Sequence, residues 1–163
     1  MVNRMFLVPM HWCAMATADP EAFGAQIAAA ARAWIGSAFR PQGRGVGGLD
    51  CLGLVLESLK ATGIQLPVPK LAMRGHAERQ VLCRMQELGL QQYPVHQAIV
   101  GDVLLAFPAT RQTHLAVRTE TGFVEANAAL RRVVERPWAG GVGWHSAWRL
   151  RRPAATDCAR FPR

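Results

Sequence analysis

Two kinds of hydrophobic spacing follow one another along the chain. In the first half, apolar residues recur every three or four positions, the period of a helix that buries one face. From residue 102 onward, apolar and polar residues alternate in short runs separated by Gly, Pro and Thr, which is typical of half-buried strands. Helices first and strands second indicate an α+β fold with an antiparallel sheet.

Three helices are expected in the first half. The first starts at Asp19, an N-cap acid followed by proline, and continues to Gly36. Its expected buried residues are Phe23, Ile27, Ala30 and Trp34. The second starts at the N-cap Asp50, after a glycine-rich loop over 37–49, and the third covers 76–88. The expected buried face of the second helix contains Leu52, Val55, Leu56 and Leu59.

Strands are expected over 102–107, 114–118, 122–127, 132–136 and 145–150. Because side chains alternate along a strand, His114, Ala116 and Arg118 share one face of the second of these strands. Leu115 and Val117 share the other face.

The composition supports a folded chain. Half of the 163 residues are apolar and 18% are charged, which excludes a disordered or fibrous protein. No apolar run reaches the roughly 18 to 20 residues that span a bilayer, so we expect no stable membrane anchor, and we expect no signal peptide. We expect a single domain over 1–163, with a core over 20–152 and loosely ordered ends over 1–18 and 153–163.

The net charge of +8, from 19 basic and 11 acidic residues, favours polyanionic partners in general. The arginines are scattered and lack the interleaved aromatic residues of a nucleic-acid module. We therefore interpret them as a solvated basic surface and expect no nucleic-acid partner.

Four cysteines lie far apart and form no Cys-x-x-Cys pair, so we expect no metal site. Cys83 lies in an apolar helical pattern and is expected to be buried or half-buried. Cys51 directly follows the glycine-rich loop at the start of a helix, where the helix dipole and unsatisfied N–H groups favour a reactive thiolate. An inert cysteine on an amphipathic helix is the alternative from position alone.

A thiolate nucleophile also needs a general base, which is usually histidine. Five histidines are present, and His114 begins a strand with a clear alternation. A lone strand histidine is more often a structural residue, so the pattern makes His114 a candidate only.

The motifs around these residues resemble the NlpC/p60-type cell-wall cysteine peptidases. The resemblance rests on Ala-Trp-Ile-Gly-Ser-Ala-Phe-Arg at 33–40, Asp-Cys-Leu-Gly-Leu-Val at 50–55, Gly-Asp-Val at 101–103, His-Leu-Ala-Val at 114–117 and Gly-Phe-Val-Glu-Ala at 122–126. It runs from about residue 23 to 149 in the family's order. Leu52, a helix near residue 80 and Trp-Arg at 148–149 particularly resemble the phage and gene-transfer-agent branch, whose members accompany tail-tip components.

The resemblance implies a papain-like core and hydrolysis of amide bonds in peptidoglycan stem peptides, typically between D-glutamate and a diamino acid. It makes Cys51 the nucleophile and His114 the base, with no cofactor. It puts Asp50, Phe39 and Leu52 on the substrate side. The family usually has tyrosine in place of Phe39 and serine in place of Leu52, which indicates altered specificity.

The third, orienting residue falls at Glu125, where the family more often has His, Asn or Gln. A four-residue turn over 118–121 would set Glu125 opposite His114, whereas a two-residue turn at 120–121 would set Asn127 there. The Phe-Val-Glu-Ala resemblance favours Glu125, with Asn127 in reserve.

The resemblance also implies a setting. We expect a peptidoglycan substrate and phage-like tail-tip partners, with the protein made in the bacterial cytoplasm, assembled into a phage-like tail and active in the periplasm. The alternative is a catalytically weak or inactive structural tail-tip module on the same fold.

Overall fold

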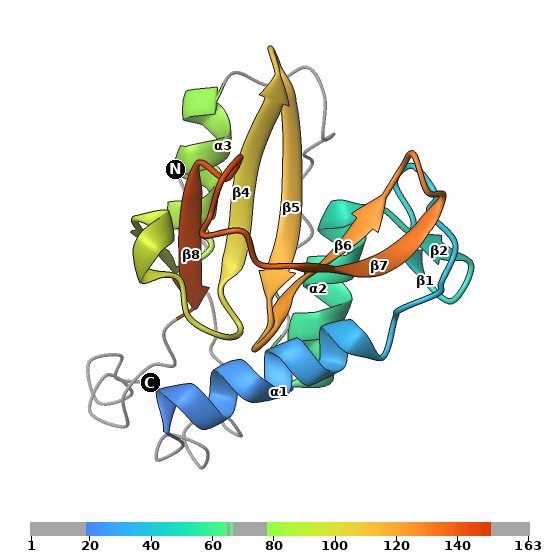
Figure 1. The fold of residues 1–163 in the computed structure, drawn as a ribbon, viewed down its shortest axis with the longest axis horizontal. Helices are drawn as coiled ribbons and strands as arrows, with labels where there is room; N and C mark the ends of the chain where they lie inside the picture. Colours follow the sequence, from blue (N-terminus) through green and yellow to red (C-terminus); the bar gives the residue numbers. More distant parts are fainter. Residues whose placement is uncertain (1–18, 65, 67–77, 151–163) are drawn as a thin grey trace, which may run out of the picture.

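The computed structural model describes residues 19–64, 66 and 78–150. Within them, three α-helices pack against a six-stranded antiparallel sheet (Figure 1). The helices are α1 Pro20–Arg32, α2 Cys51–Ala61 and α3 Glu78–Glu87. The α+β fold with an antiparallel sheet, expected from the hydrophobic spacing, is confirmed. The ends over 1–18 and 153–163 lie outside the described residues.

The sheet is a meander with two strands added at one side. In spatial order its strands are β3 Leu90–Tyr93, β8 Ser146–Leu150, β4 Val103–Ala109, β5 Gln112–Arg118, β6 Gly122–Asn127 and β7 Arg132–Pro137. Five of these strands match the expected ones to within two residues at either end. The edge strand β3 was missed because Leu90 is its one buried residue, so it shows no alternation.

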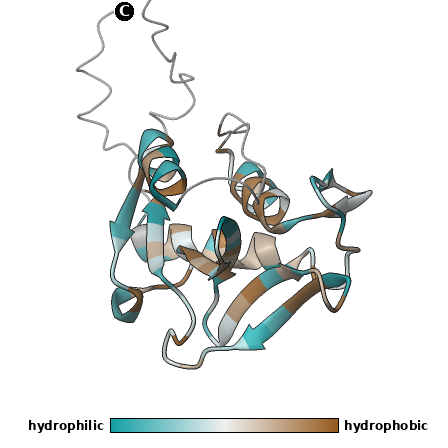
Figure 2. Ribbon diagram, turned by 90° about the horizontal axis from the view of Figure 1, so that it is seen from above, coloured by the Kyte–Doolittle hydropathy of each residue, from teal (hydrophilic) through white to brown (hydrophobic). Residues whose placement is uncertain are grey.

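The two faces of the sheet are covered differently. Leu115 and Val117 point into the main core, which all three helices share with the sheet. In Figure 2, α2 and α3 stand on the same side of the strands. On the opposite face, Ala116 and Phe123 belong to a second apolar cluster, against which Trp138 and Trp144 pack. In Figure 1 the segment that carries both tryptophans, between β7 and β8, crosses in front of β5.

Helix α2 is the central helix of the core. Six consecutive residues of its first two turns, Cys51 to Leu56, are buried, along with Ser58 and Leu59. A helix that is buried nearly all round needs cover on several sides. Helix α1 covers one side and β5 and β6 cover another, so α2 is more enclosed than the single expected stripe suggests.

Helix α1 is shorter than expected. Its N-cap Asp19 accepts the N–H of Glu21 at 3.0 Å, but the helix ends at Arg32 and turns lead to Gly36. Its buried side chains are Phe23, Ile27, Ala28 and Ala31. Ala30, expected on this face, is half-buried because the stripe follows four-residue steps from Phe23.

Two further expectations were wrong. The segment over 37–49 contains a small hairpin, β1 Arg44–Gly45 and β2 Gly48–Leu49, which positive φ angles at Gly45 and Gly48 allow. Cys83 is exposed on α3, because the buried residues Val81 and Met85 put it on the far side of that helix.

No helix in the described part of the chain is long and apolar enough to span a membrane.

Gly24 lets α1 lie close against the turn that precedes β4, and this contact predicts an effect on stability. A Cβ at this position would lie 2.1 Å from the carbonyl oxygen of Val100. We expect Gly24→Ala to lower the free energy of unfolding by about 1–3 kcal/mol through overpacking. Alanine's better helix propensity, worth about 1 kcal/mol, offsets only part of this loss. Urea denaturation measures the change.

The matched control is Ala25→Gly, an exposed position on the same helix. It is expected to cost only the intrinsic preference for alanine over glycine, about 0.5–1 kcal/mol. A Gly24→Ala protein more stable than the wild type would contradict a close contact between α1 and the turn at Val100.

Candidate active site

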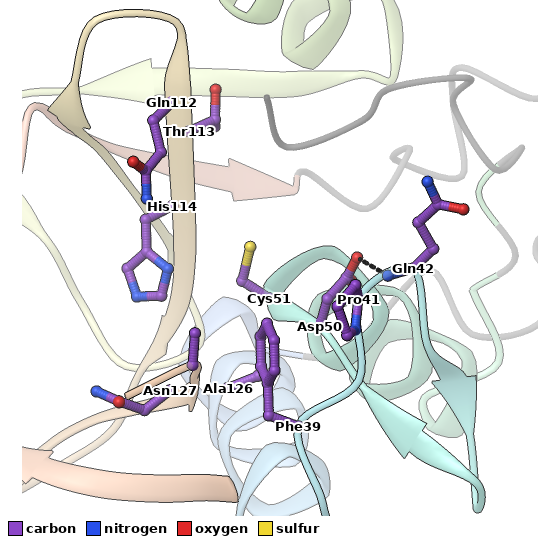
Figure 3. Close-up of a pocket in the computed structure, with 11 residues that line it drawn as sticks. Phe39, Pro41, Gln42, Asp50, Cys51, Gln112, Thr113, His114, Ala126 and Asn127 are labelled. Carbon is purple, nitrogen blue, oxygen red and sulfur yellow. Dashed lines mark hydrogen bonds between the residues drawn. The ribbon is translucent and has the colours of Figure 1, made fainter. Parts of the chain in front are cut away.

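The buried carboxylate of Asp50 joins the glycine-rich segment to the first turn of α2. It accepts the backbone N–H of Gly53 at 2.7 Å as the N-cap, and that of Gln42 at 3.0 Å from the loop (Figure 3). The guanidinium of Arg44 pairs with the same carboxylate. A Cβ at Gly53 would lie 2.1 Å from the carbonyl oxygen of Gly43, which explains the glycine in the motif. The loop is therefore held tightly on the helix end.

Cys51 is the first residue of α2 and only 5% exposed. The N–H groups of Cys51 and Leu52 precede the first intrahelical hydrogen bond, so they have no partner inside the helix. These two groups and the helix dipole favour negative charge at this end. The sulfur thus lies where a thiolate, and an oxyanion formed next to it, would both be stabilised.

His114 reaches this helix end because β5 and β6 diverge. The two strands pair over 116–118 and 123–125. Beyond these pairs they separate in Figure 1, and the N-terminus of α2 lies behind the gap. Cys51 and His114 line the same pocket, and Cys51 is one of the groups that raise the pKa of His114, so the structure brings the two residues together.

Glu125 binds His114, although the register differs from the expected one. Ala116 is paired with Glu125, and Thr119 N–H donates to the Gly122 carbonyl across a two-residue turn. This register sets Asn127, not Glu125, opposite His114, so the expected four-residue turn was wrong. Glu125 is the diagonal neighbour on the same face, within reach of a long side chain.

The side chains of β5 and β6 form a hydrogen-bonded chain. His114 Nε2 and Glu125 Oε2 lie 2.6 Å apart, which leaves Nδ1 as the nitrogen facing Cys51 (Figure 3). Asn127 Nδ2 donates to Glu125 Oε1 at 2.8 Å. The orienting residue and its reserve therefore act in series: Asn127 holds Glu125, and Glu125 contacts the imidazole.

Burial opposes the charged form of His114, but hydrogen bonds to Cys51 and Glu125 outweigh it and raise the pKa of His114 to about 9. Burial likewise disfavours the charged form of Glu125. The bonds from His114 and Asn127, with Arg136 at 3.6 Å, nevertheless lower the pKa of Glu125. An imidazolium next to a carboxylate and a sulfur is therefore the favoured state at neutral pH.

These residues line a pocket of about 500 Å³. Its lining is Phe39, Pro41, Gln42, Asp50, Cys51, Gln112, Thr113, His114, Ala126, Asn127 and Ala128. In Figure 3, Phe39 and Cys51 stand on one side of the pocket, and His114 and Asn127 stand on the other. The pocket is therefore open next to both Cys51 and His114.

The three residues expected on the substrate side have different positions. Phe39 lines the pocket and is half-buried. Asp50 also lines it, but its oxygens are occupied by the loop and the helix. Leu52 was misplaced: it is 5% exposed in the core and is not part of the pocket lining. Each step along a helix rotates the side-chain direction by about 100°, so Leu52 points away from the pocket that Cys51 lines.

Sequence reasoning missed two groups at this site. Gln112 and Thr113 line the pocket at the start of β5, which begins two residues earlier than expected. Trp144 stacks on His114 from a glycine-rich segment in which no strand or helix was expected. In the described part of the chain, no three His, Cys, Asp or Glu side chains are grouped as metal ligands would be.

Comparison with known proteins connects this geometry to one fold. No family model and no curated protein matches the sequence. The NlpC/p60 domain of the peptidoglycan hydrolase SagA matches with a TM-score of 0.57 and 24% identity, over 76% of this chain and 96% of that one. The peptidoglycan hydrolase RipB from Mycobacterium tuberculosis matches with a TM-score of 0.62 and 18% identity, over 88% of this chain and 72% of that one.

RipD from the same organism, a non-catalytic NlpC/p60 domain protein, matches with a TM-score of 0.55 and 19% identity, over 78% of this chain and 95% of that one. At these identities the likeness establishes the architecture. The chain has the fold of the NlpC/p60 cell-wall peptidase domains, which its sequence motifs resemble.

The raised pKa of His114 predicts how Glu125 affects stability. A pKa raised from near 6.5 to about 9 adds stability that is fully present below about pH 6.5 and is lost as the pH rises through about 9. We expect Glu125→Gln to lower the pKa of His114, measured by NMR titration. It should also destabilise the protein more at about pH 6 than at about pH 10.

Asn127→Ala is the companion variant, because it removes a hydrogen bond to Glu125 and keeps the charge. We expect a smaller fall in the pKa of His114 than with Glu125→Gln. A larger fall with Asn127→Ala would transfer the orienting role to Asn127.

The positions of Leu52 and Phe39 predict opposite outcomes for restoring the family's usual residues. Leu52→Ser removes a buried side chain and should lower the free energy of unfolding by about 2–5 kcal/mol. Phe39→Tyr adds a hydroxyl at the half-buried pocket wall and should leave stability within about 1 kcal/mol. Urea denaturation of the two single variants separates them. A Leu52→Ser protein of wild-type stability would contradict the core position.

Proposed function

We propose that the protein is a cysteine peptidase that hydrolyses amide bonds in peptidoglycan stem peptides. The observation that carries the proposal is the chain of contacts from Cys51 at a helix N-terminus, through His114, to Glu125 at 2.6 Å, along one pocket. Nucleophile, base and orienting group in this order make an activated thiolate. The similarity to SagA and RipB, both described as peptidoglycan hydrolases, supports the substrate class.

The proposed reaction uses only groups of this chain and water. The Cys51 thiolate attacks the scissile carbonyl carbon, and the N–H groups of Cys51 and Leu52 hold the oxyanion. The C–N bond breaks as the His114 imidazolium gives its proton to the leaving amine, which leaves a thioester on Cys51. His114 then takes a proton from water, whose oxygen attacks the thioester and releases the acid and the thiol.

We further propose a bond between D-glutamate and a diamino acid, because the motifs at 50–55 and 114–117 resemble peptidases of that specificity. Phe39, in place of the usual tyrosine, makes the wall opposite His114 apolar (Figure 3). A stem peptide with an apolar or uncharged group next to the scissile bond suits this wall. The change alters which stems are accepted and retains the nucleophile and base.

A second candidate function is binding without cleavage, as a structural module. The observation in its favour is the similarity to RipD, which is non-catalytic and adapted to peptidoglycan binding. The geometry favours hydrolysis here, because Cys51, His114 and Glu125 are all present and in contact.

We also propose that the protein is part of a phage-like tail, made in the bacterial cytoplasm and acting in the periplasm. Leu52, the helix over Glu78–Glu87 and Trp148 with Arg149 support this proposal through their resemblance to the tail-associated branch. Co-purification with intact tails, and its loss from tail-less particles, tests it.

Zymography on Gram-negative sacculi tests the enzyme directly. The wild type should clear the sacculi, and Cys51→Ala and His114→Ala should each abolish clearing. The double variant should be no worse than either single one, because the two residues act as a unit.

The matched control is Cys83→Ala, which removes an exposed thiol far along the chain and should retain full activity. Released peptides identified by mass spectrometry locate the bond. If the folded wild-type protein binds to sacculi but does not clear them, the binding module is the correct function instead.

A further inference from the structure

Trp144 packs against the base of the proposed site from the side away from the helices. Its ring stacks on the imidazole of His114, with centroids 5.8 Å apart and planes 21° apart. Phe123 meets the same indole edge-on at 5.0 Å and 80°. The indole is therefore held between a pocket residue and the second apolar cluster.

The segment that carries Trp144 is anchored on both sides. Trp138 lies under the guanidinium of Arg118, 4.3 Å from the ring centroid. A Cβ at Gly141, whose φ is +85°, would lie 2.2 Å from a methyl carbon of Val95, so the segment lies close against the 3₁₀ turn there. At its far end, the N–H of His145 donates to the Leu105 carbonyl at 2.7 Å. These contacts fix the indole over the imidazole.

We propose that Trp144 is a positioning residue that holds the His114 ring where Nε2 meets Glu125 and Nδ1 faces Cys51, and keeps water off that side of the pair. For catalysis this rests on the proposed function. The effect on Cys51 does not depend on it. Stacked rings prefer such offset geometry, and an indole face also favours an imidazolium over a neutral ring.

The physical consequence follows from the freedom that Trp144 removes. Without the indole, the imidazole can rotate about its Cβ–Cγ bond and break contact with both partners. The titratable groups at the ring are Cys51 from α2 and Glu125 from β6, with Arg136 of β7 behind Glu125. Directly before β8, His145 packs edge-on to Phe107 at 5.1 Å. A thiolate that loses its imidazolium partner forms only at higher pH.

The test uses the full chain and follows alkylation of Cys51 by iodoacetamide across pH, with mass spectrometry to separate it from the other cysteines. In Trp144→Ala, the rate at about pH 6 should fall about tenfold, the effect of moving the thiol ionisation by one pH unit. The wild-type and variant rates should converge at about pH 10. Trp144→Phe retains a stacking ring and should keep most of the wild-type profile.

Trp138→Ala is the matched control. Trp138 lies on the same segment as Trp144 and packs against the same second apolar cluster, but its ring partner is Arg118. It should destabilise the protein and leave the pH profile in place. If Trp144→Ala does not fold, Trp144→Leu fills the site without an aromatic face and replaces it. An unchanged profile in that variant, or an equal shift in Trp138→Ala, would overturn the proposal.

Cleavage of stem peptides gives the second readout. In Trp144→Ala, kcat should fall about 10- to 100-fold with KM unchanged, as for a misplaced catalytic group. If the alkylation profiles shift as stated and the wild type cleaves no stem peptide, the positioning role stands and the proposed reaction fails. If the wild type cleaves and Trp144→Ala retains its kcat, the positioning role fails and the reaction stands.

Discussion

The site depends on one buried carboxylate. Asp50 is 6% exposed, and a buried charge is tolerated only when its hydrogen-bonding capacity is filled. Its partners here are Gly53 in the helix, Gln42 in the loop and the guanidinium of Arg44. The same contacts that stabilise the charge therefore fix the start of α2, the position of Cys51 and the loop that forms one wall of the pocket. A change at Asp50 would disturb all three at once.

The second requirement is the divergence of β5 and β6. A fully paired sheet would keep His114 on the face opposite the helices, separated from Cys51 by the backbone. In β5, pairing with β6 covers only 116–118 and does not reach back to His114, and the start of α2 lies behind the resulting gap. This explains why the imidazole has two kinds of neighbour. The helix end supplies the sulfur on one side, and the second apolar cluster supplies Trp144 on the other.

How much the sequence could predict depended on whether a feature is local. The caps Asp19 and Asp50, the five strands and the place of Cys51 follow from neighbours in the chain, and the structure has them. The contact between His114 and Glu125 was expected for the wrong reason, because a diagonal reach of a long side chain is invisible to a rule about opposite residues. Trp144 could not be found at all, since its segment has glycines in place of any periodic pattern and its role arises only from tertiary packing.

The choice of a carboxylate as third residue has an electrostatic consequence. With a thiolate and an imidazolium, a neutral third residue leaves the site uncharged, whereas Glu125 gives it a net charge of −1. Arg136 and the helix N-terminus offset that charge from two directions. Together with Cys51, Glu125 raises the pKa of His114 to about 9, so the imidazolium persists over a wide range of pH. In the proposed reaction, the raised pKa makes His114 a weaker acid toward the leaving amine, because a proton donor works best with a pKa near the working pH. In the proposed reaction, the carboxylate thus makes His114 a poorer proton donor in exchange for an imidazolium that persists at neutral pH.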